Sequence, residues 1–141
     1  MTRRRQAREL AFRAAYQADV TGDPVVRCLE EILEDQDMEE VADPEARAFA
    51  LALVSTLAKH QPEIDDVVSR IARNWSLARM AATDRSIIRL AAAELLYHVE
   101  VPVRVTLDEA IEIAKKYGME TSGAFVNGIL DRLAHDVRPT G

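Results

Sequence analysis

Hydrophobic residues recur every three or four positions along almost the whole chain, which is the spacing of amphipathic α-helices. The first apolar stripe comprises Ala7, Leu10, Ala11, Ala14, Ala15 and Ala18. We expect this first helix to end at Gly22. The stripe also predicts that Arg4, Arg5, Arg8 and Glu9 face solvent or a ligand.

Caps and breakers divide the rest of the chain into further helices. Asp23-Pro24 and Asp43-Pro44 each join an N-cap residue to a proline that suits the first turn. The acidic segment 34–40 between these two helices is expected to be a loop. Pro62 is expected to break the chain before a fourth helix, whose apolar face ends at Trp75.

The fifth helix has the most apolar stripe, at 87–96, so we expect it to be the most buried. Thr83 is its expected N-cap. The short segment 101–105 is strand-like but isolated, and Pro102 favours an extended connector. Thr106 and Glu109 then match a capping box, and Gly118 is expected to end the sixth helix.

The last helix is expected to begin near Thr121 or Ser122. Gly128 falls inside its helical period, where glycine costs about 1 kcal/mol relative to alanine. This cost predicts that the backbone of another helix, or of a partner, approaches Gly128 closely.

Six or seven helices joined by short loops predict an all-α bundle. A length of 141 residues corresponds to about one domain. Because Pro62 lies near the middle, we expect two helical subdomains, about 1–61 and 62–141, that share a core. No apolar run approaches the ~20 residues of a membrane span. With no secretory signal and the single cysteine Cys28, the sequence predicts a cytoplasmic protein.

The N-terminal end of this acidic protein is basic. The chain has 18 Lys+Arg and 24 Asp+Glu, a net charge of −6. Residues 1–18 contain five arginines and one acid, Glu9, whereas residues 19–45 contain eleven acids and one base, Arg27. Such segregation predicts a local site for an anion, most simply a phosphate backbone. A solvated N-terminus is the alternative interpretation.

The sequence offers no signature of catalysis or metal binding. His60, His98 and His135 are far apart, and there is no Cys-x-x-Cys, no Gly-rich phosphate loop and no nucleophile elbow. Asp65 and Asp66 are better explained as acids near a helix start than as a catalytic pair. We therefore expect no enzyme activity, no metal and no cofactor.

Three segments together resemble the NusB family of bacterial transcription antitermination factors. The first is RRRQARELA at 3–11, followed by Tyr16-Gln17, and the second is DRSIIRLA at 84–91. The third is VTLDEAIEIAKKYG at 105–118 followed by FVNGILD at 125–131, and it is the most specific. The resemblance spans nearly the whole chain.

The resemblance implies an all-α protein of two helical subdomains without catalytic activity. It implies binding to boxA, a short single-stranded RNA in the leaders of ribosomal RNA operons. It also implies a complex with NusE, a ribosomal protein of the small subunit, which strengthens RNA binding. The assembly joins elongating RNA polymerase and helps it to pass terminators.

Several residues match positions of the family's RNA site. Arg4, Arg5 and Arg8 match its arginine-rich motif and Arg3 extends it, since arginine binds phosphate bidentately and stacks on unpaired bases. Phe125 matches a position near bound RNA, although an ordinary core position is equally expected.

The helix start at Thr121-Ser122 offers backbone N–H groups to a phosphate. On the side that faces NusE in the family, the matching residues are Tyr16 and Asp84. A helix N-terminal acid that complements the dipole explains Asp84 equally well.

Two other functions remain open on the sequence. NusB-like domains also occur fused to RNA cytosine methyltransferases, but this chain ends at Gly141 without room for a catalytic domain, so an enzyme would be a separate partner. The other alternative is a helical dimerisation module, in which the arginines meet acids of a protein partner or a second copy. A gel shift with boxA RNA against scrambled RNA separates these functions.

Overall fold

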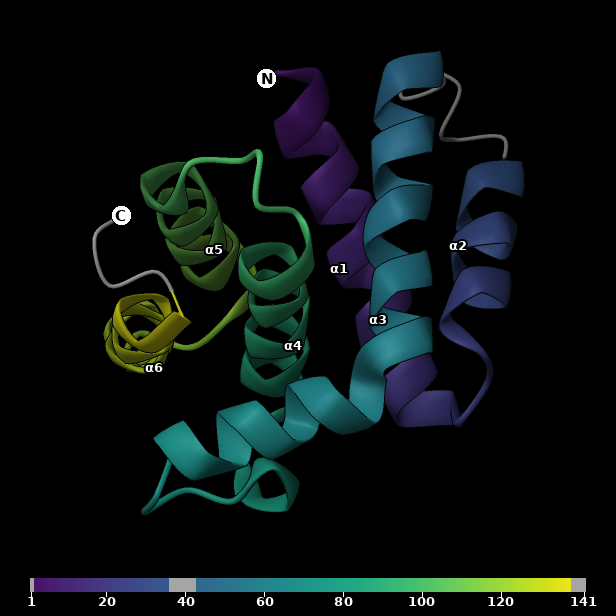
Figure 1. Cartoon of the computed structure of the whole chain (residues 1–141). Coiled ribbons are helices and arrows are strands. Elements are labelled where there is room, and N and C mark those ends of the chain that lie inside the picture. The colour runs from purple at the N-terminus through teal and green to yellow at the C-terminus, as the bar shows by residue number, and fades with distance from the viewer. Residues whose placement is uncertain (1, 36–42, 138–141) are drawn as a thin grey trace.

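The computed structural model describes residues 2–35 and 43–137, and all regular elements in these ranges are helical (Figure 1). The α-helices are α1 (Arg3–Thr21), α2 (Val25–Glu34), α3 (Pro44–Ile71), α4 (Ala82–Tyr97), α5 (Val103–Tyr117) and α6 (Ser122–Val137). A short 3₁₀ turn, η2 (Leu77–Arg79), lies between α3 and α4. The prediction of an all-α bundle is confirmed.

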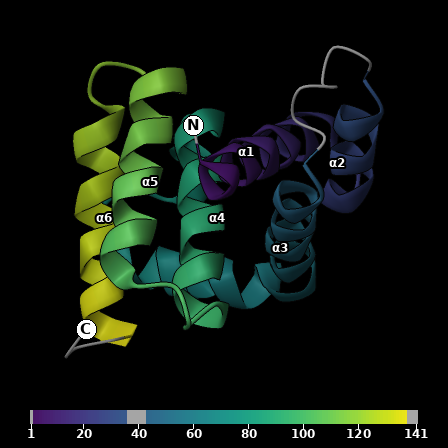
Figure 2. The same cartoon turned by 90° about the horizontal axis from the view of Figure 1, so that it is seen from above.

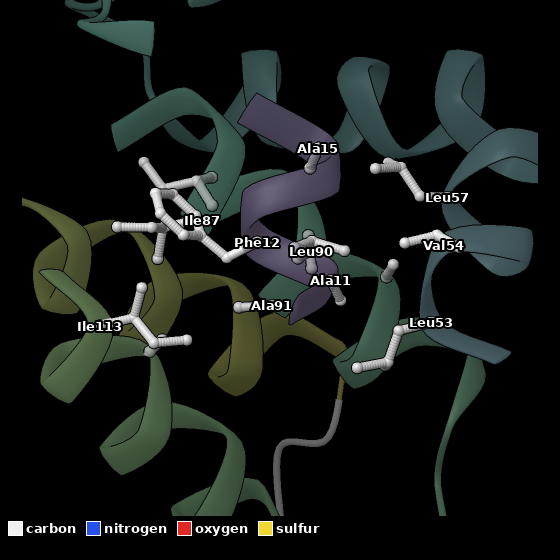
Figure 3. Packing of buried hydrophobic residues seen from close by; sticks show 14 of the residues in the cluster. Ala11, Phe12, Ala15, Leu53, Val54, Leu57, Ile87, Leu90, Ala91 and Ile113 are labelled. Carbon is white, nitrogen blue, oxygen red and sulfur yellow. The ribbon is translucent and has the colours of Figure 1, made fainter. Parts of the chain in front are cut away.

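Helix α1 passes through the middle of the molecule, between α2 and α3 on one side and α4 and α5 on the other (Figures 1 and 2). Its small apolar residues allow close packing against both groups. Figure 3 shows Ala11 and Phe12 of α1 next to Leu53 of α3, Leu90 of α4 and Ile113 of α5. One continuous apolar core therefore joins the elements that carry the candidate site.

Local signals determine the ends of several helices, and those at Gly22 and Asp43 were predicted from the sequence. Thr2 caps α1 by accepting the Arg5 N–H at 3.0 Å, and Gly22 ends the helix with a φ of 82°, a left-handed conformation that suits glycine. At the start of α3, Asp43 accepts the N–H groups of Glu45 and Ala46.

The break predicted at Pro62 appears as a kink inside α3, where His60 has a non-helical φ of −118°. The two helical segments on either side of this kink run in different directions (Figure 1). Proline lacks the N–H of an i→i−4 hydrogen bond and its ring crowds the preceding turn, so a kink is the expected distortion of a continuing helix. The helix ends at Ile71, so Trp75 lies outside it and is exposed rather than part of an apolar face.

Three predicted helix starts are wrong. Pro24 and Ala81 occupy the N-cap positions of α2 and α4 without a side-chain cap, so neither Asp23 nor Thr83 has that role. Helix α5 begins at Val103 within the segment predicted to be extended. Thr106 is therefore a buried residue of this helix and not a cap.

Gly118 and Gly128 have opposite surroundings. A Cβ added at Gly128 would meet no atom within 4 Å, so the expected close approach of another backbone is wrong for the described residues. At Gly118 a Cβ would lie 2.6 Å from Ser122 Cβ and 2.7 Å from the Ala114 carbonyl oxygen.

In the predicted acidic loop, Glu34 ends α2 and Asp35 follows it, while residues 36–40 lie outside the described ranges. Within the described residues, every helix is too short or too polar to cross a bilayer.

Candidate RNA and partner interface

The four predicted arginines lie in the first two turns of α1, but they have different environments. Arg3 and Arg4 are exposed and Arg5 is half-buried. Arg8 is only 6% exposed. The expectation that the whole group faces solvent or a ligand is therefore correct for the first turn and wrong for Arg8.

Arg3 and Arg5 are each anchored to a neighbouring helix by carboxylates. The Arg3 guanidinium bridges Asp43 at 2.8 Å and Glu45 at 3.1 Å at the start of α3. Arg5 donates from Nε and Nη2 to both oxygens of Glu109 on α5, at 2.9 and 3.0 Å. The negative charge of Asp43 raises the pKa of Arg3, and the hydrogen bond that Arg5 donates to Glu109 raises the pKa of Arg5. Both cations are held in place while part of each guanidinium faces outward.

Arg4 rests on an aromatic ring. Its guanidinium carbon lies 3.9 Å from the centroid of Phe49 of α3, within the range of a cation–π interaction. Arg8 approaches the same ring at 5.1 Å. Phe49 therefore positions the one first-turn arginine for which no carboxylate partner is found among the described residues.

Arg8 forms the core of a buried polar cluster. Its Nε and Nη2 donate to Glu94 of α4 at 2.9 and 2.8 Å, and Glu94 is only 2% exposed. Thr106 of α5 donates its hydroxyl to the same carboxylate. Arg8 of α1 and Thr106 of α5 thus both donate to Glu94 of α4, and the cluster joins the three helices. Arg8 is therefore not available as a free cation.

Glu9 is also buried against α5, contrary to expectation. Its Oε1 accepts from Lys116 Nζ at 2.6 Å and from the Tyr117 hydroxyl at 2.9 Å. Burial, followed by the hydrogen bond and charge of Glu9, raises the pKa of Tyr117, and the same carboxylate raises the pKa of Lys116. Helix α5 thus contacts α1 through Glu109 near its middle and through Lys116-Tyr117 at its C-terminal end.

The residues predicted at the start of α6 differ in their exposure to solvent. Thr121 is exposed, directly before the helix, whereas Ser122 is 2% exposed. Ser122 Oγ accepts the Met119 N–H at 2.9 Å and so closes the turn after Gly118. Phe125 is half-buried and meets Trp75 edge to face, with centroids 5.7 Å apart.

The residues predicted to face a protein partner lie by a groove formed by α1, α2, α4 and α5. Tyr16 lines this groove with Phe12, Val20 and Tyr117, and it is 41% exposed. Asp84 follows Thr83, which lines the same groove, in the first turn of α4. One of its oxygens, Oδ1, is buried without a hydrogen-bond partner.

Sequence reasoning missed the residues that position the arginines, namely Phe49, Glu94, Thr106 and Glu109. Glu94 and Thr106 stand 86 and 98 positions from Arg8 along the chain, and no local pattern links residues at such separations. One signal was available in the sequence, namely Glu94 within the otherwise apolar stripe at 87–96. A carboxylate buried in such a stripe requires a cationic partner.

Comparison with known proteins gives one consistent result. The family model described as the NusB family matches residues 5–135. Transcription antitermination protein NusB from Pseudothermotoga lettingae is 43% identical, over 99% of this chain and 96% of the relative. The protein of the same name from Geobacter sulfurreducens is 41% identical over the full length of both.

Two solved structures are similar over nearly their whole length. The NusB of T. maritima has 42% identity and a TM-score of 0.86, and the match covers 96% of this chain and 92% of that one. A crystal structure of antitermination factors NusB and NusE in complex with dsRNA has 27% identity and a TM-score of 0.86, with 96% and 98% of the chains covered.

Proposed function

The chain belongs to the NusB family, and from this premise we propose that it is a transcription antitermination factor that binds RNA together with NusE. The RNA is the single-stranded boxA element in the leaders of ribosomal RNA operons, and the complex joins elongating RNA polymerase. The protein acts by binding, without a catalytic step, in the cytoplasm. Residues 1–141 act as one domain with helical halves of about 1–61 and 62–141.

One observation carries RNA binding: a protein of net charge −6 presents three arginines at the exposed first turn of α1. Arg3, Arg4 and Arg5 are each braced by a neighbouring helix, so little conformational freedom is lost when they meet phosphates. Arg4 lies on Phe49 and has its other guanidinium face available to an unpaired base. Arg8 positions this turn through Glu94 instead of contacting RNA.

The groove beside Tyr16 is the proposed surface for NusE. It offers exposed apolar area from Tyr16, Val20 and Tyr117. Asp84 follows Thr83 of this groove and is half-buried, and its negative charge suits a lysine or arginine of a basic ribosomal protein. A homodimer formed over the same groove is the alternative, and sizing of the protein alone distinguishes it.

A gel shift tests the proposal. We expect boxA RNA to be bound more tightly than a scrambled single strand, and NusE to increase this preference. A duplex of the boxA sequence forms the third arm, because a similar solved complex contains double-stranded RNA. Equal binding of boxA and scrambled RNA, with and without NusE, contradicts the proposed function.

A further inference from the structure

The aromatic ring under Arg4 is itself in contact with a histidine. The centroids of Phe49 and His98 are 6.3 Å apart, and the two rings stand at 74° to each other. Such an edge-to-face arrangement is a preferred geometry of aromatic pairs. Phe49 and His98 are both half-buried, whereas Arg4 is exposed. The pair therefore forms the support on which the Arg4 guanidinium rests.

The imidazole of His98 is fixed by a hydrogen bond whose direction follows from its neighbours. His98 Nε2 lies 2.9 Å from Thr56 Oγ1 of α3. The Thr56 hydroxyl donates its single proton to the Ala52 carbonyl oxygen at 2.9 Å, so it accepts from the histidine. Nε2 therefore carries a proton. Because Thr56 lies about two helical turns after Phe49, both residues contact His98 from the same side of α3.

The backbone of His98 is anchored to the residue that also holds Arg8. The His98 N–H donates to the Glu94 carbonyl oxygen at 2.9 Å where α4 ends. The Glu94 carboxylate binds Arg8, whose guanidinium carbon lies 5.1 Å from the centroid of Phe49. Two groups bonded to Glu94, one through its main chain and one through its side chain, thus contact the Phe49 ring. Together they restrict the orientations that this ring can adopt.

We propose that His98 is a positioning residue of the RNA site. It holds the Phe49 ring in one orientation, and this ring in turn presents the outer guanidinium face of Arg4 to an unpaired base. A guanidinium on an unrestrained ring would have to be ordered when RNA binds, at a cost in binding free energy. The inference rests on the proposed function, since it names the residue through which an RNA-binding arginine is oriented.

The orientation of Arg4 can be measured without RNA. Side-chain protons of Arg4 that lie over the Phe49 ring should show upfield ring-current shifts in NMR spectra of the protein alone. Phe49→Leu should abolish these shifts, and His98→Ala should reduce them. Thr56→Val removes the acceptor for His98 with little change of shape and should also reduce them, whereas Thr56→Ser keeps the hydroxyl and should preserve them.

A second histidine between the same two helices provides the matched control. The His60 ring stacks on Tyr97, with centroids 3.9 Å apart and an interplanar angle of 11°. His60→Ala therefore removes an imidazole from a different aromatic pair and should leave the Arg4 shifts unchanged. Thermal melts show which variants fold, and the two Thr56 variants decide the matter if His98→Ala does not.

RNA binding gives an independent measurement with the single-stranded boxA RNA of the gel shift. His98→Ala should weaken binding by about 2- to 5-fold, the affinity equivalent of an exposed cation–π interaction. The log–log salt slope should stay the same, because no phosphate contact is lost. The variant Arg4→Ala/His98→Ala should bind as Arg4→Ala does, since His98 acts through Arg4. A purely structural role would lower the affinity in both backgrounds.

The possible outcomes separate this inference from the proposed function. Unchanged Arg4 shifts in His98→Ala and Thr56→Val overturn the inference, while boxA binding by the parent leaves the proposed function intact. Equal losses of affinity from His98→Ala with and without the Arg4 side chain also overturn it. Arg4 shifts that follow the variants, in a protein that does not bind boxA RNA, support the role of His98 and contradict the proposed function alone.

Discussion

The guanidinium of Arg8 and the carboxylate of Glu94 form a buried bidentate ion pair, with N···O distances of 2.9 and 2.8 Å. Thr106 donates to the same carboxylate, so the pair joins α1, α4 and α5. Because α1 also carries the exposed arginines, this cluster fixes the position of the candidate RNA site relative to the C-terminal helices.

Arg8→Ala should lower the free energy of unfolding by about 3–5 kcal/mol, since it leaves the Glu94 charge buried without a partner. The double variant Arg8→Met/Glu94→Leu should be less damaging, because no charge then remains in the core. Urea denaturation measures both. A stable Arg8→Ala protein that has only lost RNA binding would show that Arg8 acts directly on RNA.

Arg4→Ala/Arg5→Ala should weaken RNA binding. Arg4 is exposed, whereas loss of Arg5 leaves the largely buried Glu109 carboxylate without its partner, so a thermal melt of the variant accompanies the binding measurement. The log–log salt dependence should become flatter by about 0.7 for each phosphate that the variant no longer neutralises. Fluorescence anisotropy over a series of salt concentrations measures the slope. Arg27→Ala removes an exposed arginine of α2 that pairs with Glu31 and serves as the control, and equal slopes for all proteins would exclude the first turn as the RNA site.

Helix boundaries were predictable where one or two neighbouring residues determine them. Asp43 caps α3 with its own side chain, and Gly22 adopts a conformation that few other residues accept. Thr106 was misread because the same residue type that caps a helix also serves as a buried donor, and only the position of Glu94 decides between these roles. The interruption at Pro62 was also predictable, because proline lacks the N–H of an i→i−4 hydrogen bond, and it appears as the kink at His60.

The candidate site was predictable in location but not in organisation. Segregated charge indicated the first turn of α1, and the family resemblance pointed to Tyr16 and Asp84. The separation of exposed Arg4 from buried Arg8 depends on contacts with Phe49 and Glu94 from distant parts of the chain. A sequence pattern gives the face of a helix, but not which partner occupies that face.

Asp84→Lys should weaken NusE binding by reversing the charge at the edge of the Tyr16 groove, while RNA binding by the isolated protein stays nearly unchanged. Asp84→Asn keeps the shape and separates charge from structure. Calorimetric titration with NusE gives the affinities, and thermal melts report stability. If both variants have a much lower melting temperature than the parent, Asp84 stabilises the N-terminus of α4, and its assignment to the interface is wrong.

Asp19 should contribute to stability only while it is ionised. Burial raises its pKa, but hydrogen bonds and charge from Arg85 and Arg89 outweigh burial and hold the pKa below the ordinary 3.8. A carboxyl group whose pKa is lower in the folded than in the unfolded protein stabilises the fold fully at pH values above its unfolded-state pKa. This contribution is lost as the pH falls through the folded-state pKa. Unfolding free energy should therefore decrease on acidification below about pH 4.

The Asp19→Asn variant isolates this contribution. It should be less stable near neutral pH by about 1.5–3 kcal/mol, the range for hydrogen bonds to charged groups, and its loss of stability below about pH 4 should be shallower. Asp66→Asn removes a carboxylate from an exposed pair with Arg70 and should match the parent. Parallel acid profiles for the parent and Asp19→Asn would contradict the prediction.

Alanine substitutions at Gly118 and Gly128 should change stability in opposite directions. Gly128 lies within α6 with no atom within 4 Å of an added Cβ, so Gly128→Ala should stabilise the protein by up to about 1 kcal/mol through helix propensity. At Gly118 the new methyl would overlap Ser122 Cβ and the Ala114 carbonyl, neither of which can rotate away. Overpacking of this kind costs about 1–3 kcal/mol.

The turn after Gly118 sets the start of α6, because Ser122 closes it by accepting the Met119 N–H. Gly118→Ala should therefore lower the melting temperature and also disturb Phe125, one turn further along the helix. Near-ultraviolet circular dichroism of the Trp75–Phe125 pair reports that disturbance alongside the melts. The opposite result, with Gly118→Ala tolerated and Gly128→Ala destabilising, would mean that another backbone approaches α6 at Gly128. The packing of α6 described above would then be wrong.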